Sequence, residues 1–177
     1  MKKRAREERV YEIGQLPRKN SYEIALIGRS NVGKSSLLNK LVGYSIAQVS
    51  QRPGCTMWLG IHNLDKVTLV DLPGYGYAKS PESRRKIVNE LVMQYFDLER
   101  TDRVLLLVDS RRGLMEVDKE MLEFFGSKSV AVTLVGTKAD KKHSAKEEYD
   151  FITSSKYNTG IKELKEYILN LPSSISW

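Results

Sequence analysis

Residues 28–35 read Gly-Arg-Ser-Asn-Val-Gly-Lys-Ser and fit the spacing G-x-x-x-x-G-K-[ST], which is typical of a phosphate-binding loop. Glycines at this spacing let the backbone curl so that successive N–H groups point at phosphate oxygens. The Lys34 ammonium can reach the β- and γ-phosphates of a nucleotide, and the Ser35 hydroxyl can bind Mg²⁺. The alternative, a turn without a ligand, is disfavoured because an expected strand precedes the loop and an expected helix follows it. The residues expected to contact the nucleotide here are Gly28, Arg29, Ser30, Asn31, Val32, Gly33, Lys34, Ser35 and Ser36.

A second motif, Thr137-Lys138-Ala139-Asp140, follows an apolar run and can select the base. The Asp140 carboxylate can accept hydrogen bonds from the ring N–H and the exocyclic amine of guanine, and adenine lacks both donors at those places. The stem of Lys138 can lie along the base. Further on, the backbone N–H groups of Thr153, Ser154 and Ser155 can meet the guanine oxygen. The alternative for the first motif is an ordinary polar loop after a strand.

Two further segments have the features of nucleotide-sensing switches. Asp71 follows an expected strand, where its carboxylate can hold Mg²⁺ through water, and the Gly74 N–H can sense the γ-phosphate. Thr56 lies in a loop with Pro53 and Gly54, and its hydroxyl can be a second protein ligand to Mg²⁺. The alternative is that Thr56 is an ordinary loop threonine. We expect both segments to be ordered by the γ-phosphate and released after hydrolysis.

Short apolar runs alternate with amphipathic stretches along the chain, and these elements must position the motifs. We expect strands at 22–27, 61–64, 67–70, 104–108 and 130–135, and helices at 34–42, 81–99, 116–125 and 161–171. Gly126 and Pro172 are expected to end the last two helices. In the helix at 81–99 the predicted buried face consists of Ile87, Leu91, Tyr95 and Leu98. This order predicts an α/β domain with a mainly parallel sheet and helices on both faces.

Composition bounds the possible classes of protein. The chain has 177 residues, of which 41% are apolar and 29% charged, a balance typical of one globular domain. No stretch is long and apolar enough to span a membrane, and the single cysteine, Cys55, excludes an intrachain disulfide. The net charge of +7 indicates either an ordinary basic surface or contact with an anionic polymer such as nucleic acid. The charge-dense residues 1–20 are expected to be a basic N-terminal extension before a domain at 21–177.

Together these motifs resemble the EngB family of ribosome-biogenesis GTP-binding proteins, and the similarity runs from about Glu23 to Leu169. The most specific match is Asp-Leu-Pro-Gly-Tyr-Gly-Tyr-Ala-Lys at 71–79. Other matches are Gly-Arg-Ser-Asn-Val-Gly-Lys-Ser-Ser at 28–36, Arg-Pro-Gly-Cys-Thr at 52–56, Val-Asp-Ser-Arg at 108–111 and Thr-Lys-Ala-Asp-Lys at 137–141.

The resemblance implies a three-layer P-loop NTPase fold of the Ras-like G-domain type, and GTPase activity. It implies Mg²⁺ at Ser35 and Thr56, with Asp71 as a further candidate, and it adds nucleotide contacts from Gly54, Cys55, Thr56, Asp71, Leu72, Pro73 and Gly74. It also implies the large ribosomal subunit and its RNA as partners, a role in assembling that subunit, and a link to cell division and septation. We expect a monomer in the cytoplasm, or in an organelle if a transit peptide has been removed.

The chain departs from the family pattern at two places. Only residues 141–152 separate the Asp140 motif from the Ser154 motif, where the family places a helix and a strand. Met57 and Trp58 follow Thr56, where the family often has a glutamine.

Hydrolysis is expected to be slow because Tyr75 occupies the position where many GTPases carry a glutamine that orients the attacking water. Asn31 stands where K⁺-activated GTPases carry an asparagine near the ion. The hypothesis is that K⁺, alone or with ribosomal RNA, replaces an arginine finger; the alternative is that Asn31 only shapes the loop. The candidate catalytic residues are Lys34, Asn31, Thr56 and Gly74. Arg29, Arg111 and Arg112 either reach the site or are solvated.

Two other functions compete with ribosome assembly. A membrane-associated signalling or trafficking GTPase would carry a lipid signal, but the C-terminal residues include no prenylation cysteine and Met1-Lys2 excludes N-terminal myristoylation. A small-molecule kinase or ATPase is disfavoured by the Asp140 motif. His62 and His143 lack the spacing of metal ligands and are expected to be surface or core residues.

Overall fold

The computed structural model describes residues 8–43, 57–76, 81–141 and 148–174. Within these residues seven strands form one sheet in the order β1-β3-β4-β2-β5-β6-β7. The strands are β1 (Glu8–Val10), β2 (Tyr22–Gly28), β3 (Leu59–Leu64), β4 (Val67–Asp71), β5 (Arg103–Asp109), β6 (Ala131–Thr137) and β7 (Phe151–Ile152). The helices are α1 (Lys34–Val42), α2 (Glu82–Asp97), α3 (Glu116–Ser127) and α4 (Ile161–Asn170), with 3₁₀ turns η1 (Ile13–Gln15) and η2 (Leu171–Ser174).

The central strand β2 is parallel to β4 on one side and to β5 on the other, and β6 and β7 continue the parallel part. Only β1 and β3 are antiparallel to their neighbours. After β2 the chain therefore forms β3 and β4 on one side of this strand, and it then crosses to form β5 on the other side. Open α/β sheets bind ligands at such a point, beyond the carboxyl ends of the strands.

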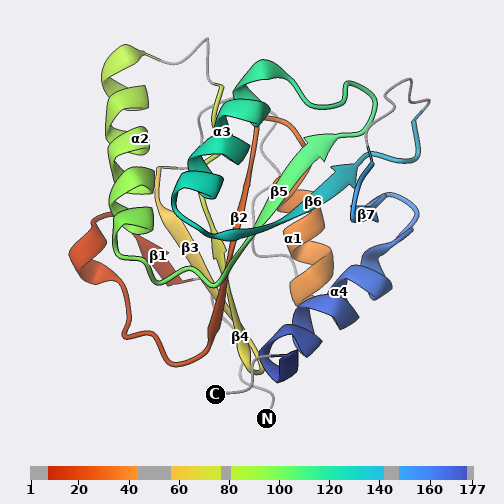
Figure 1. The fold of residues 1–177 in the computed structure, drawn as a ribbon, viewed down its shortest axis with the longest axis horizontal. Coiled ribbons are helices and arrows are strands. Elements are labelled where there is room, and N and C mark those ends of the chain that lie inside the picture. Colours follow the sequence, from red (N-terminus) through yellow and green to blue (C-terminus); the bar gives the residue numbers. More distant parts are fainter. Residues whose placement is uncertain (1–7, 44–56, 77–80, 142–147, 175–177) are drawn as a thin grey trace.

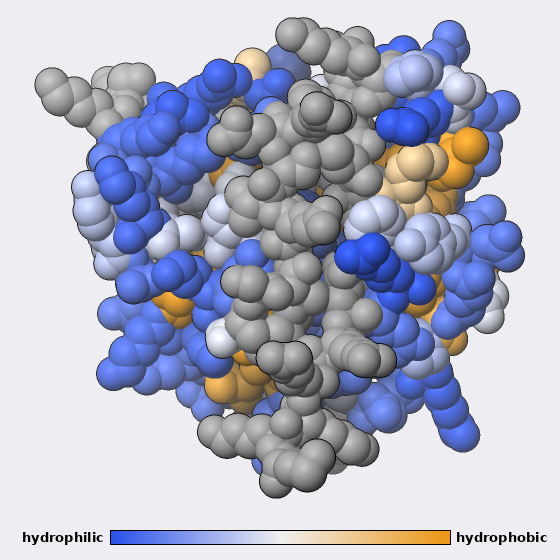
Figure 2. All heavy atoms as spheres, turned by 180° about the vertical axis from the view of Figure 1, so that it is seen from behind, coloured by the Kyte–Doolittle hydropathy of each residue, from blue (hydrophilic) through white to orange (hydrophobic). Residues whose placement is uncertain are grey.

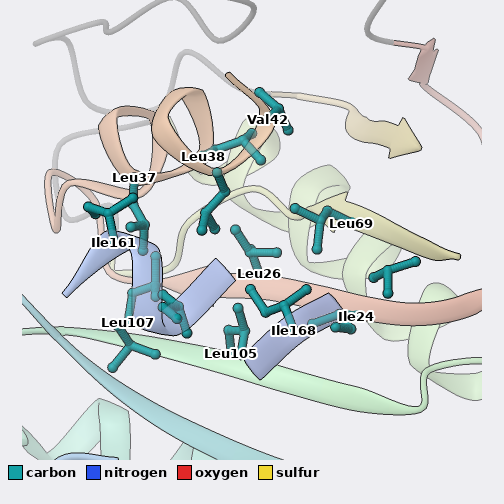
Figure 3. Close-up of a cluster of buried hydrophobic side chains, with 14 of the residues drawn as sticks. Ile24, Leu26, Leu37, Leu38, Val42, Leu69, Leu105, Leu107, Ile161 and Ile168 are labelled. Carbon is teal, nitrogen blue, oxygen red and sulfur yellow. The ribbon is translucent and has the colours of Figure 1, made fainter. Parts of the chain in front are cut away.

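The sheet separates two apolar cores because successive side chains of a strand point to opposite faces. In β2, Ile24 and Leu26 face α1 and α4, whereas Ala25 and Ile27 face α2 and α3. Figure 3 shows the first core, in which Leu37 and Leu38 of α1 and Ile161 and Ile168 of α4 close over β2, β4 and β5. Figure 1 shows the resulting three layers. The predicted fold class is confirmed.

The predicted buried face of α2 is wrong in part. Leu91 and Tyr95 are buried, but Ile87 and Leu98 are 55% and 49% exposed. The buried stripe is Val88, Leu91, Val92, Tyr95 and Phe96, which repeats at three- and four-residue steps and is rotated by one residue from the predicted stripe. Its aromatic end packs on Phe125 of α3, with 5.1 Å between the ring centroids of Phe96 and Phe125.

Several predicted boundaries also shift. Gly126 lies inside α3, and the left-handed residue that follows the helix is Ser129, with φ 54°. Pro172 lies in η2, which continues α4 instead of ending it. Glu8–Val10 pairs antiparallel with β3, so part of the segment expected to be an extension completes the sheet edge. Of residues 141–152, the described part contains the two-residue strand β7.

Candidate nucleotide site

The loop between β2 and α1 has the backbone shape that its sequence predicts. A Cβ on Gly28 would lie 2.7 Å from the carbonyl oxygen of Leu107, so only glycine lets the loop start this close to β5. Gly33 has φ 104° and Asn31 has φ 62°, both in the left-handed region. These two residues bend the chain immediately before α1, so the amino-terminal N–H groups of the helix face the loop.

Lys34 is the first residue of α1, and its ammonium forms a buried ion pair with the carboxylate of Asp71. The side chains of Lys34 and Asp71 are only 9% and 5% exposed. Because a buried ammonium is costly without an anionic partner, this pair brings the end of β4 to the phosphate-binding loop. Two predicted site residues that are 37 positions apart in the chain thus meet.

Hydroxyl and carboxylate oxygens occur at the same place. Ser35 and Ser36 are half-buried in the first turn of α1, beside the Lys34–Asp71 pair. Hydroxyl and carboxylate oxygens suit Mg²⁺, which takes one or two protein oxygens together with phosphates and water. The described residues contain no group of three or more His, Cys, Asp or Glu side chains placed to hold a metal. Gly54, Cys55 and Thr56 lie outside the described residues.

The segment after Asp71 is fastened to the phosphate-binding loop by its backbone. The Tyr75 N–H donates to the Gly28 carbonyl at 3.2 Å, and the Ser30 N–H donates to the Tyr75 carbonyl at 3.0 Å. Leu72, Pro73 and Gly74 are buried within this segment. Two backbone hydrogen bonds therefore hold Tyr75 against the phosphate-binding loop.

The side chain of Tyr75 points to α3. Its hydroxyl donates to the Asp118 carboxylate at 2.6 Å, and the second oxygen of Asp118 accepts from the Met115 N–H at 2.8 Å. Burial, followed by the hydrogen bond to Asp118, raises the pKa of Tyr75. The phenol therefore stays protonated and is held by the first turn of α3.

The Thr137–Asp140 motif also contacts the phosphate-binding loop. The Thr137 hydroxyl donates to the Val32 carbonyl at 2.6 Å, and the Lys138 ammonium donates to the Asn31 carbonyl at 2.5 Å. The same ammonium lies 3.0 Å from the Asp109 carboxylate, which also binds Arg111. These contacts fix the base-selecting motif relative to the phosphate-binding loop.

Asp109 ends β5 at the centre of this arrangement. Although burial opposes ionisation, hydrogen bonds from Arg111 and Lys138 hold the pKa of Asp109 well below its usual range. Its side chain is 12% exposed, so the carboxylate is a largely desolvated anion between two cations. Asp109 thus orients Lys138.

The two predicted guanine-contacting motifs meet at Asp140 and Ser154. The Ser154 hydroxyl donates to the Asp140 carboxylate at 2.8 Å, and this bond lowers the pKa of Asp140. The Ser154 N–H donates to the Thr159 carbonyl, and the Thr153 N–H donates to the Gly136 carbonyl. Of the three backbone N–H groups expected to meet the guanine oxygen, two therefore have partners within the protein, which leaves Ser155 as the candidate.

Sequence reasoning gave no role to Asp109 or Asp118. Asp109 belongs to the Val-Asp-Ser-Arg motif at the end of a strand, which is the signal that could have found it. Asp118 is the third residue of α3, where a carboxylate commonly caps the backbone. Their partners Lys138 and Tyr75 are 29 and 43 positions away in the chain.

The remaining expectations concern three arginines and two histidines. Arg111 pairs with Asp109, Arg112 is exposed, and a Cβ on Gly76 would lie 3.5 Å from Nε of Arg29. His62 is a core residue, 1% exposed, whereas His143 lies outside the described residues. No helix in the described ranges is long and apolar enough to cross a bilayer. Figure 2 shows that most of the coloured surface on the face opposite to that of Figure 1 is hydrophilic.

Comparisons with known proteins match this chain to one family of GTP-binding proteins. A family model described as "50S ribosome-binding GTPase" matches residues 23–138. The probable GTP-binding protein EngB of Aquifex aeolicus (strain VF5) is 38% identical over 165 residues, which cover 84% of this chain and 90% of that protein. The probable GTP-binding protein EngB of Wolbachia pipientis wMel is 40% identical over 136 residues, covering 73% of this chain and 68% of that protein.

Solved structures share the fold. A crystal structure of a probable GTP-binding protein engB superposes with a TM-score of 0.70 at 22% identity, over 86% of this chain and 100% of the other. Era in complex with MgGDPNP and nucleotides 1506–1542 of 16S ribosomal RNA superposes with a TM-score of 0.69 at 27% identity. That match covers 85% of this chain and 56% of Era.

Proposed function

The chain belongs to the EngB family of P-loop GTPases, and from this membership we propose that it assists the assembly of the large ribosomal subunit while it cycles between GTP and GDP. The observation that best supports a guanine site is the hydrogen bond between Ser154 and Asp140. An ionised carboxylate fixed by a neighbouring hydroxyl can accept two hydrogen bonds from guanine. Against adenine the same carboxylate would face no matching donors, so binding would remove water from it without replacing those hydrogen bonds, which costs affinity.

The nucleotide would lie across the carboxyl ends of the parallel strands. Its phosphates would contact the N–H groups of residues 28–36, and Lys34 would bind the β- and γ-oxygens. The base would lie between the Lys138 stem and the Asp140 carboxylate, with the Ser155 N–H facing the guanine oxygen. The contacts from Lys138 and Thr137 to the phosphate-binding loop support this arrangement, because they fix the distance between the base and phosphate subsites.

The Mg²⁺ ion would be held by Ser35 and Thr56, with Asp71 acting through water. Asp71 is suited to this role because it already lies beside Lys34 at the loop. When bound, the ion would neutralise charge on the β- and γ-phosphates. Gly74 would place its N–H near the γ-phosphate, and Leu72 and Pro73 would hold it there.

Intrinsic hydrolysis would be slow. The Tyr75 hydroxyl is bound to Asp118, which supports the view that it does not position the attacking water. The catalytic set would be Lys34, Asn31, Thr56 and Gly74, and K⁺ held near Asn31 would supply the missing positive charge. Asn31 is exposed and its carbonyl is fixed by Lys138, so its side chain is available for this role.

The ribosomal partner is supported by the family and by charge. The matching family is described as ribosome-binding, Era has been solved with ribosomal RNA, and this chain carries a net charge of +7. We propose a cytoplasmic monomer whose partners are the large subunit and its RNA, with links to cell division and septation. No observation favours the membrane-associated alternative.

The test is cosedimentation of the protein, loaded with GDP or with a non-hydrolysable GTP analogue, with purified large and small ribosomal subunits. The expected result is nucleotide-dependent binding to the large subunit. Liposomes of anionic lipid serve as the comparison for the membrane alternative. Absence of large-subunit binding in both nucleotide states would refute the assembly role.

A further inference from the structure

We propose that a pocket between the phosphate-binding loop and the start of α3 binds a phosphate group of an RNA backbone. The pocket has a volume of about 240 Å³ and lies between residues 29–32, the end of β5 and the residues just after it. This inference rests on the proposed ribosomal function and names a surface for it. Lys34, Ser35 and Asp71 do not line the pocket, whereas residues 29–32 and Lys138 do. The pocket therefore adjoins the expected nucleotide site on the side of α3 and does not include the Lys34–Asp71 pair.

The charge of the pocket favours an anion. Its charged lining consists of the cations Arg29, Arg111, Arg112 and Lys138 and the carboxylates Asp109 and Asp118. One water occupies about 30 Å³, so the volume accommodates a phosphate together with several waters.

Both carboxylates are already engaged with protein donors. Asp109 binds Arg111 and Lys138, and Asp118 binds the Tyr75 hydroxyl and the Met115 N–H. Only Asp109 is paired with cations, whereas Asp118 keeps its negative charge, so the four cations of the lining outnumber the two carboxylates by two. The excess positive charge of the pocket resides on Arg29 and Arg112.

Arg29 is the better placed of these two cations. Its Nη1 donates to the sulfur of Met115 at 2.6 Å, and its Nε is buried with no hydrogen-bond partner. Thioether sulfur is a weak acceptor, so a half-buried guanidinium with five N–H donors is poorly satisfied. Arg112 is exposed at the rim and forms no ion pair with any described residue.

The chemistry of the lining favours a backbone phosphate over a base. Guanidinium groups bind phosphate through two parallel N–H donors, which is the strong form of this interaction. Among the described residues that line the pocket there is no aromatic side chain on which a base could stack. A ligand bound here would therefore be recognised through its phosphate, independently of sequence.

The experiment is an NMR titration of the GDP- and Mg²⁺-loaded full chain with a hexauridylate RNA. The signals to follow are the Arg29 Nε–H and the Gly113 N–H. We expect saturable shifts, and at least about fivefold weaker binding in Arg112→Gln, the effect of one charge-assisted hydrogen bond to a phosphate. Arg84→Gln, an exposed arginine of α2, is the matched control and should change the affinity less than about twofold.

Four results would overturn the proposal: no saturable shift with hexauridylate, equal affinities of the two variants, a shift with inorganic phosphate but none with hexauridylate, or stronger binding of a hexaglutamate peptide. The wild-type titrations decide the case if Arg112→Gln does not fold. Cosedimentation of the wild type with large subunits is run separately. A failure there refutes the assembly role, whereas the RNA titration still decides the pocket.

Discussion

The Tyr75 hydroxyl donates a 2.6 Å hydrogen bond to Asp118, which ties the segment after Gly74 to the first turn of α3. Because the backbone of Tyr75 is also hydrogen-bonded to Gly28 and Ser30, one residue links α3, the segment after Asp71 and the phosphate-binding loop. These contacts indicate a structural role for Tyr75, which can be tested separately from a catalytic one.

Tyr75→Phe should therefore destabilise the protein without slowing hydrolysis. Loss of the hydroxyl leaves an oxygen of Asp118 unsatisfied, at a cost of about 1–2 kcal/mol in the free energy of unfolding. Urea unfolding and single-turnover GTP hydrolysis measure the two effects. Tyr157→Phe, at a tyrosine that is 64% exposed, is the control. A large fall in hydrolysis rate with unchanged stability would instead give the phenol a catalytic role.

Asp140→Asn should change base preference. The amide can no longer accept both guanine donors, so we expect GDP affinity to fall at least about 100-fold, while xanthosine diphosphate, whose carbonyl can accept from the amide, should bind better. Fluorescence competition with both nucleotides gives the ratio. Asp97→Asn, an exposed aspartate of α2, should leave the ratio unchanged. An unaltered ratio in Asp140→Asn would exclude this residue as the base selector.

Asn31→Gly should abolish activation by K⁺. Glycine adopts the left-handed backbone of Asn31, with φ 62°, and keeps the carbonyl that accepts from Lys138, so only the side chain is lost. Turnover in KCl and in NaCl, with and without large subunits, is the measurement. GDP affinity should stay within about threefold. Equal wild-type turnover in the two salts would refute the hypothesis that K⁺ replaces an arginine finger.

Asp109→Asn should weaken nucleotide binding and make the free energy of unfolding depend less on pH in the acid range. The wild-type pKa of Asp109 is lowered on folding, so below the usual aspartate pKa of about 3.9 the unfolded state binds a proton that the native state does not. The stabilisation from Asp109 is therefore present above that pH and is lost as the pH falls further.

In Asp109→Asn this pH-dependent part disappears, and at pH 7 we expect a loss of about 1–3 kcal/mol in unfolding free energy. GDP affinity should fall about tenfold because Lys138 loses its charged partner. Urea unfolding at pH 3, 4, 5 and 7 with fixed excess GDP tests the slope. Asp97→Asn is again the matched control, and identical slopes in the two variants would contradict the assignment.

Gly28→Ala should destabilise the fold through its Cβ alone. That atom would lie 2.7 Å from the Leu107 carbonyl oxygen, which belongs to the sheet and cannot move cheaply. We expect a loss of about 1–3 kcal/mol, typical of overpacking. Gly14→Ala, where no atom lies within 4 Å of the added Cβ, controls for the change in backbone entropy. Thermal unfolding of both variants gives the comparison. Equal melting temperatures would mean that the loop accommodates the added Cβ without a cost in stability.

The layers and the phosphate-binding loop could be predicted because local patterns encode them. Apolar runs of five or six residues mark the buried parallel strands, and the spacing of glycines and Lys34 marks the loop. The buried face of α2 was predicted only in part because two apolar stripes compete on that helix. Only tertiary packing decides that Val88 and Phe96 are buried rather than Ile87 and Leu98.

The supporting contacts of the site could not be predicted in the same way. Glu23 looks like a surface residue inside a strand, yet it is 2% exposed and accepts from Arg100 and the Tyr95 hydroxyl. Asp109 and Asp118 likewise depend on partners brought together only by the sheet. Gly54, Cys55 and Thr56 lie outside the described residues, so their contacts stay predictions.

The two edge strands of the sheet are short, and this affects how readily the protein could pair with other chains. In the described residues the edge strands have only three and two residues, β1 and β7, and β1 begins with the charged Glu8 and Arg9. A short, charged edge offers few unpaired backbone groups on which a foreign strand could add. At high protein concentration the described part of the chain should therefore resist recruitment into intermolecular sheets, while the carboxyl ends of its parallel strands remain open to ligands.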